Sequence, residues 1–108
     1  MTRDKRTIKF TKPIVSNEEG LQLATPEIVA KYIAKRLKTD IIADLGCGIG
    51  GQVIFFAMEC RKVYAVDNDP EKLQFAKENC RLYGVDNVEF ILGDALSAKV
   101  KEKVSDAD

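Results

Sequence analysis

The sequence predicts an α/β protein whose parallel three-stranded sheet is flanked by helices. From residue 41 onward, short apolar segments alternate with longer segments of helical periodicity, a pattern typical of strand–helix–strand units. A glycine-rich turn at residues 46–51 separates the first apolar segment from the helical segment that follows it. At 108 residues the chain has room for one small domain.

The individual elements follow from periodicity and from the residues that bound each segment. Strands are predicted at residues 41–45, 62–67 and 88–92, in the spatial order 3-2-1, and helices at 52–59, 70–83 and 95–104. Asp69 is expected to cap the second of these helices ahead of Pro70. Gly84 is expected to end that helix in a left-handed conformation.

Residues 1–24 are predicted to form a basic N-terminal arm, and residues 25–108 to form a ligand-binding half-domain. Within the arm, residues 7–11 have a strand-like pattern, and a loop is expected after them. The run Thr25-Pro26-Glu27 indicates a helix start, with Thr25 as the capping residue. Apolar residues then recur at helical spacing, which predicts a packed face made of Ile28, Tyr32, Ile33 and Leu37.

The formal charge is zero, but its distribution is uneven. Residues 1–38 carry nine Lys and Arg against four Asp and Glu, whereas residues 39–108 carry eight against thirteen. The arm is therefore either an RNA-binding segment that follows a phosphate backbone or a solvated tail. Its basic residues are Arg3, Lys5, Arg6, Lys9 and Lys12.

Composition also restricts the chemistry and the compartment. The chain has no His, and its three cysteines, Cys47, Cys60 and Cys80, lack the spacing of metal ligands. Neither a metal site nor a His-based acid–base mechanism is expected. No apolar run approaches the ~20 residues of a membrane span, so a cytoplasmic protein with reduced thiols is expected.

The glycine-rich turn is the central candidate for ligand binding. Gly46, Gly48 and Gly51 satisfy the spacing G-x-G-x-x-G, which lets a ligand approach the backbone at the start of a helix. Dinucleotide-binding dehydrogenases use the same spacing, so an NAD-binding oxidoreductase remains an alternative. A non-enzymatic ligand-binding module is a further alternative.

Three acidic residues at successive strand ends separate these interpretations. Asp44 precedes the first glycine by two positions, where it would repel a pyrophosphate but attract the ammonium group of S-adenosylmethionine. Asp67 ends the second strand, where a carboxylate can accept both ribose hydroxyls. Asp94 follows the third strand and could accept from an adenine amino group. As alternatives, Asp44 could cap a turn and Asp94 could cap the last helix.

Together these segments resemble motifs I, II and III of the class I S-adenosylmethionine-dependent methyltransferases. The resemblance implies that the glycine loop and Asp44 hold the methionine moiety, Asp67 the ribose and Asp94 the adenine. The candidate cofactor-binding residues are Thr25, Asp44, Gly46, Cys47, Gly48, Gly50, Asp67, Asn68, Asp94 and Ala95.

A narrower similarity links the chain to the trimethylguanosine synthase group of RNA cap guanine-N2 methyltransferases. It is carried by Thr25-Pro26-Glu27, Gly50-Gly51, Asn79 and Tyr83-Gly84. In that group the hydroxyl corresponding to Thr25 lies near the cofactor. RNA is thus the expected substrate class, and the Rossmann-like methyltransferase fold is the expected architecture.

The part of such enzymes that acts on the substrate is not found in this sequence. A fourth strand ending in a Pro-Pro-aromatic motif is typical of enzymes that methylate base amines, and the chain has no such motif. No catalytic residue is therefore assigned, and the fold is expected to be truncated before the fourth strand. An unpaired edge on the first strand would then favour self-association.

Overall fold

The sheet of this protein contains three parallel strands in the order β1-β2-β3, as seen in a computed structural model that describes residues 10–108. These are β1 (Ile41–Leu45), β2 (Lys62–Asp67) and β3 (Val88–Leu92). The central strand β2 pairs with both neighbours, and its register places Ile41 beside Lys62 and Val63 beside Val88. The predicted fold class, strand order and strand limits are confirmed.

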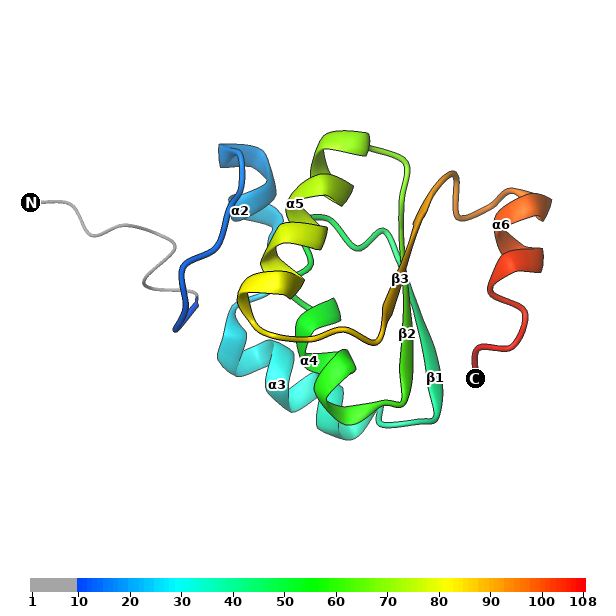
Figure 1. Ribbon diagram of the computed structural model, residues 1–108, viewed down its shortest axis with the longest axis horizontal. Helices are drawn as coiled ribbons and strands as arrows, with labels where there is room; N and C mark the ends of the chain where they lie inside the picture. Colours follow the sequence, from blue (N-terminus) through cyan, green and yellow to red (C-terminus); the bar gives the residue numbers. More distant parts are fainter. Residues whose placement is uncertain (1–9) are drawn as a thin grey trace, which may run out of the picture.

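Helices cover both faces of this sheet. Helices α4 (Val53–Glu59) and α5 (Pro70–Leu82) lie on one face, and α6 (Ala98–Lys103) lies on the other (Figure 1). The larger core lies under α4 and α5, and the smaller core brings Val100 of α6 onto the opposite face. Within residues 10–108, no helix is both long enough and apolar enough to span a bilayer.

The ends of α5 agree with the prediction, whereas the start of α6 does not. The Asp69 carboxylate accepts from the Glu71 amide at 2.9 Å, and Gly84 has a φ of +72° after the helix. Helix α6 begins three residues later than predicted because Asp94 accepts from the Leu96 amide in a local turn. Ser97 is therefore the cap of α6, and Leu96, which stands before the helix, is 79% exposed.

A short helix, α2 (Glu18–Leu23), stands where a loop was expected. Asn17 caps it by accepting from the Gly20 amide at 2.7 Å, and two glutamates occupy its first turn. The predicted strand at residues 7–11 falls mostly outside the described residues, and Phe10 and Thr11 are not in a strand.

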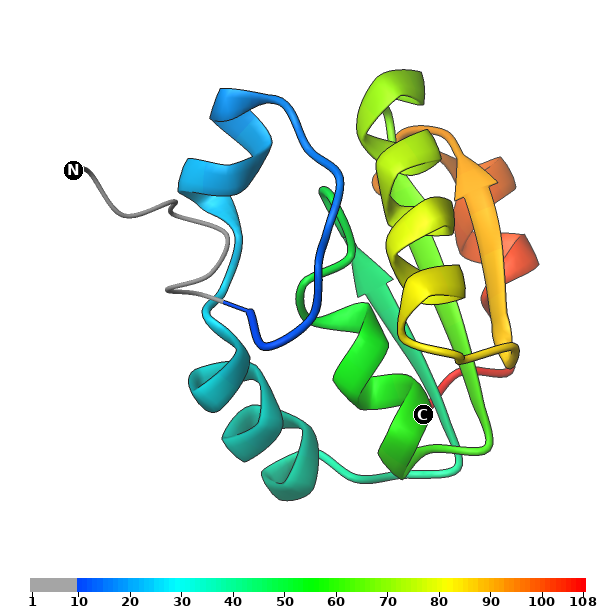
Figure 2. The same ribbon diagram turned by 60° about the vertical axis from the view of Figure 1, so that its left-hand side comes forward.

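Residues 10–24 pack against the rest of the domain (Figure 2). Phe10 and Ile14 are each 3% exposed and belong to the larger core, as does Leu21. Of the predicted arm, the described part is thus tied to the fold by apolar contacts. Its basic residues Arg3, Lys5, Arg6 and Lys9 lie outside the described residues.

Helix α3 (Glu27–Arg36) shows the largest departure from the prediction. Pro26, not Thr25, stands at its N-cap, and no side chain caps the helix. Its buried face is made of Ala30 and Ala34, whose small side chains let α3 approach α4 closely. The predicted packed face is largely wrong, since Ile28, Tyr32 and Leu37 are 84%, 60% and 54% exposed.

Candidate functional site

The glycine loop runs from the end of β1 to the start of α4 and is pinned to β2. The amides of Gly46 and Cys47 both donate to the carbonyl of Val66, at 2.7 and 2.9 Å. Gly46 and Gly48 have φ values of +95° and +57°, in the region that favours glycine. A Cβ added to either glycine would meet no described atom within 4 Å, so open space lies beside the loop.

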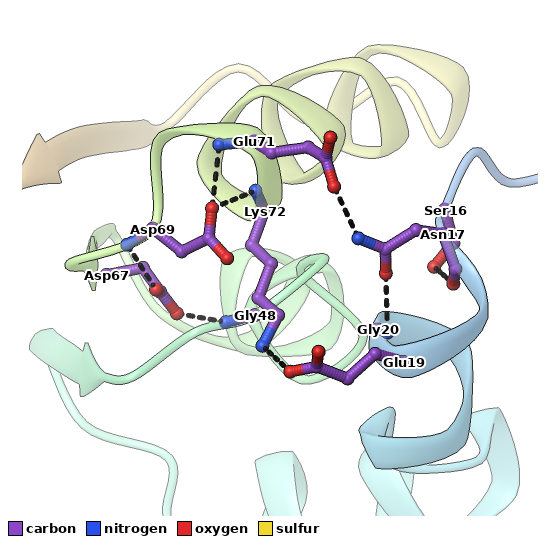
Figure 3. Close-up of polar contacts among 9 residues, drawn as sticks. All are labelled: Ser16, Asn17, Glu19, Gly20, Gly48, Asp67, Asp69, Glu71 and Lys72. Atoms are coloured by element: carbon purple, nitrogen blue, oxygen red, sulfur yellow. Dashed lines mark hydrogen bonds and ion pairs between the residues drawn. The ribbon is translucent and has the colours of Figure 1, made fainter.

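Asp67 ends β2 and organises the polar groups around the loop. Its Oδ2 accepts from the Gly48 amide and its Oδ1 from the Asp69 amide, each at 2.9 Å (Figure 3). A carboxylate offers about four acceptor positions, so capacity remains for two further donors. The Gly93 amide donates to the Asp67 carbonyl at 2.9 Å, which ties the end of β3 to the same edge.

Asp44 lies one strand away and is the most electrostatically perturbed carboxylate of the loop region. Burial, with a contribution from the negative charge of Asp67, raises the pKa of Asp44 to about 6. A cation placed beside Asp44 would favour its ionised form and offset that cost. Burial also raises the pKa of the Cys47 thiol, which keeps this side chain protonated and unreactive.

A cavity of about 300 Å³ lies beside the loop and brings distant segments together. Six of the ten candidate residues line it, namely Thr25, Asp44, Gly46, Cys47, Gly48 and Asp67. The structure therefore gathers Asp44, Asp67, the glycine loop and Thr25 around one cavity.

The other four candidates lie outside this lining. A Cβ on Gly50 would come within 3.2 Å of the Ala76 Cα, so this glycine permits close packing of the loop on α5. Asn68 and Asp94 are exposed beyond the ends of β2 and β3, and Ala95 is half-buried next to Asp94. Their assignment to the cofactor stays a prediction.

Sequence reasoning missed the wall of the cavity formed by α2. A Cβ on Gly20 would lie 2.6 Å from Ile49 Cγ2, so glycine lets α2 approach the loop. Lys72, only 15% exposed, also lines the cavity, and its Nζ lies 2.7 Å from Glu19 Oε1 (Figure 3). Asn17 donates to Glu71 beside this ion pair. The Asn17-Glu18-Glu19 capping pattern was the available signal for α2.

Asn79 joins the N-terminal segment to the glycine loop. Its amide nitrogen donates to the carbonyls of Val15 and Ile49, both at 2.9 Å, and its oxygen accepts from the Val15 amide. With 1% exposure, Asn79 is fully buried and its hydrogen bonds fix the relative position of both segments.

Glu27 joins the same segment to α3 and α5. The carboxylate is 3% exposed and accepts from the Tyr83 hydroxyl at 2.7 Å and from the Thr11 amide at 3.0 Å. Burial alone would raise the pKa of Glu27, but hydrogen bonds from Tyr83, Thr11 and Lys31 lower it to about 2. Glu27 and Asn79 thus hold the segment that supplies one wall of the cavity.

Comparison with known proteins gives a family match over most of this domain. Residues 39–108 match the model of the RNA cap guanine-N2 methyltransferase family. A probable cobalt-precorrin-6B C(15)-methyltransferase of Methanothermobacter thermautotrophicus is 39% identical over 70 residues, covering 64% of this chain and 36% of its own length. An uncharacterised RNA methyltransferase of Oceanobacillus iheyensis is 40% identical over 73 residues, covering 66% of this chain and 16% of its own.

Solved structures agree with this grouping. The tRNA m1G37 methyltransferase of Methanocaldococcus jannaschii superposes with a TM-score of 0.57 and 26% identity, covering 65% of this chain and 24% of that one. The chain thus spans about a quarter of that enzyme, and a minor part of both curated relatives. These matches favour the methyltransferase interpretation of the glycine loop over the dinucleotide one. With its Rossmann-like α/β fold, the chain belongs to the RNA cap guanine-N2 methyltransferase family.

Proposed function

We propose that this chain binds S-adenosylmethionine and forms part of an enzyme that methylates RNA. The observation that carries the proposal is the convergence of Asp44 and Asp67 with the glycine loop on one cavity. Two carboxylates at adjacent strand ends suit a ligand that presents an ammonium group and ribose hydroxyls. They do not suit a pyrophosphate, which carries negative charge of its own.

Each residue has a role that its position supports. Asp44 would hold the ammonium group of the methionine moiety, since a neighbouring cation offsets the cost of its ionisation. Gly46 and Gly48 leave the space into which the ligand fits. Asp67 has acceptor capacity for the ribose hydroxyls, and the exposed Asp94 would reach the adenine from the end of β3. The cofactor supplies an activated methyl group on its sulfonium.

RNA is the substrate class that the family match and the charge distribution favour. The family acts on RNA caps by its description, one relative is named an RNA methyltransferase, and residues 1–38 are strongly basic. Precorrin is the competing substrate, because another relative is named for it. Neither the methylated atom nor a catalytic residue is assigned to this chain.

Titration calorimetry with S-adenosylhomocysteine and with NAD tests the cofactor assignment. We expect S-adenosylhomocysteine to bind and NAD to give no heat of binding. Asp67→Ala should weaken S-adenosylhomocysteine about a hundredfold or more, because two hydrogen bonds to a charged acceptor are lost. Asp94→Ala should weaken it less, since Asp94 is exposed and offers hydrogen bonds that water can replace.

Asp67→Asn is the matched control for loss of structure, because it keeps the size and one carbonyl oxygen that can accept from Gly48. Its melting temperature should stay near that of the unchanged chain while the affinity falls. Binding of NAD in place of S-adenosylhomocysteine would contradict the proposal. An unchanged affinity in Asp67→Ala would remove the ribose assignment.

A further inference from the structure

The outward face of α3 carries an arrangement of side chains that the packing of the domain does not use. Ile28, Tyr32 and Arg36 follow one another at intervals of four residues, so they form one line along the helix. This line faces away from the buried Ala30 and Ala34, and Ile28 and Tyr32 are 84% and 60% exposed. We call these three residues together with Lys35 the α3 strip.

The exposed charged residues of α3 itself are all basic. The acidic residue of α3, Glu27, is 3% exposed and is engaged by Tyr83 and Thr11 and by an ion pair with Lys31 at 3.1 Å, whereas Lys35 and Arg36 are exposed. Lys38, between the end of α3 and the start of β1, is also exposed. An anionic partner therefore meets exposed basic side chains in the last turn of α3 and just after it.

Tyr32 gives the strip an aromatic surface that is held in place. Arg36 Nη1 donates to the Tyr32 hydroxyl at 3.0 Å, and the guanidinium carbon lies 5.7 Å from the ring centroid. The contact braces the ring at its hydroxyl end while most of the side chain stays open to solvent. An exposed ring flanked by cations is suited to stack on an unpaired base while the cations bind phosphates.

Two connections relate the strip to the rest of the molecule. Leu23 and Thr25, immediately before α3, line the cavity. A nucleic acid strand lying on the α3 strip would therefore lead toward the proposed cofactor site. The Thr11 amide donates to Glu27 at 3.0 Å, so the described N-terminal segment lies beside the first turn of α3.

We infer that the α3 strip is a docking surface for single-stranded RNA, with Tyr32 stacking on a base and Lys35 and Arg36 binding adjacent phosphates. This inference rests on the proposed function, because it takes the RNA to be the methyl acceptor. It adds which surface of the chain receives the RNA and from which direction the strand approaches the cavity.

Fluorescence anisotropy with a labelled single-stranded RNA of about ten nucleotides, titrated at several salt concentrations, tests the inference. Tyr32→Ala should weaken binding about five- to a hundredfold, the usual range for loss of one stacked base, while Tyr32→Phe should keep most of the affinity. The triple variant Lys35→Gln, Arg36→Gln, Lys38→Gln should lower the slope of log affinity against log salt by about 2.

The control is a triple variant of α6, Lys99→Gln, Lys101→Gln, Lys103→Gln, which removes the same charge from the opposite face of the sheet. Equal loss of RNA affinity in both triple variants would overturn the strip and indicate general electrostatic attraction. Unchanged RNA affinity in Tyr32→Ala would also overturn the proposed role of the α3 strip. If Tyr32→Ala instead changed only the sedimentation coefficient of the chain, the strip would be a surface for a protein partner. Because S-adenosylhomocysteine binding is measured separately, loss of the strip does not remove the cofactor assignment.

Discussion

Asp44 and Asp67 illustrate how two identical side chains acquire different properties from their surroundings. Asp67 accepts two backbone hydrogen bonds at the end of β2, from the amides of Gly48 and Asp69. Asp44 is half-buried one strand away, and burial together with the charge of Asp67 raises its pKa to about 6. A cationic ligand beside Asp44 is therefore coupled to the loss of a proton near neutral pH.

The affinity for S-adenosylhomocysteine should consequently depend on pH through Asp44. Below a pKa of about 6 the carboxyl is increasingly neutral, so affinity should fall about tenfold between pH 8 and pH 5. Asp44→Asn should bind more weakly at pH 8 and show a flat profile over the same range. Calorimetry in buffers of different ionisation enthalpy measures both the affinity and the protons released.

The pH dependence of the free energy of unfolding tests the pKa of Asp44 independently. Because the folded pKa of Asp44 lies above its unfolded value of 3.8, its contribution to stability is complete below pH 3.8 and is lost as pH rises through 6. The free energy of unfolding of Asp44→Asn should lack this decline. A parallel decline in both proteins would show that another group titrates.

At the scale of elements, local sequence was sufficient where an element is set by its own residues. The three strands are apolar runs that end at polar residues or glycine, and their limits agree with the prediction. Helix α3 was predicted with the wrong face because its two alanines share the helical period of its larger apolar residues. Which of the two faces is buried depends on α4, and close packing favours the small side chains.

The residues of the candidate site likewise fall into those that the sequence predicts and those that it does not. Asp44, the glycines and Asp67 were predictable because each lies at the end of a strand, where parallel sheets gather their ligand-binding groups. Gly20 and Lys72 were not predictable, since they reach the cavity only when α2 docks on α5, more than fifty residues away. A helix of six residues is too short to show a helical period, so only its capping pattern indicates it in the sequence.

Helix α2 should owe its position partly to the Glu19–Lys72 ion pair. Glu19 is 69% exposed, so solvent screens the pair and its contribution to stability is small. Glu19→Gln should therefore speed amide hydrogen exchange in residues 18–24 by roughly one-and-a-half- to fivefold, with no change in the strands. Hydrogen exchange followed by mass spectrometry measures this directly on the ligand-free protein.

Glu18→Gln is the matched control, because it removes the same charge from the neighbouring exposed position of α2. High salt should reduce the difference between Glu19→Gln and the unchanged chain, since screening weakens an exposed pair. Identical exchange in the two variants would mean that Asn17, Gly20 and Asn79 suffice to hold α2.

At the scale of the whole molecule, the two outer strands differ in how they meet solvent. Edge strand β3 carries the exposed Glu89, which pairs with Lys62 at 3.4 Å and discourages a further strand. Strand β1 has only Asp44 as a charged residue, and Asp44 faces the cavity. Asp108 exchanges hydrogen bonds with Ile41 at one end of β1, at 2.7 and 2.8 Å.

The amide and carbonyl of Ile41 both point toward Asp108, away from β2. Because backbone groups alternate in direction along a strand, the amides and carbonyls of Ala43 and Leu45 point to the same outer edge of β1.

We therefore expect this chain to self-associate through β1, with a sedimentation coefficient that rises with protein concentration. Leu45→Lys should abolish the rise, because a charge at the 53% exposed Leu45 opposes strand pairing. Leu92→Lys, at a 56% exposed position on β3, changes the charge equally and should leave the association intact. A chain that stays monomeric at every concentration would contradict pairing through β1, and loss of association in Leu92→Lys alone would move the contact to β3.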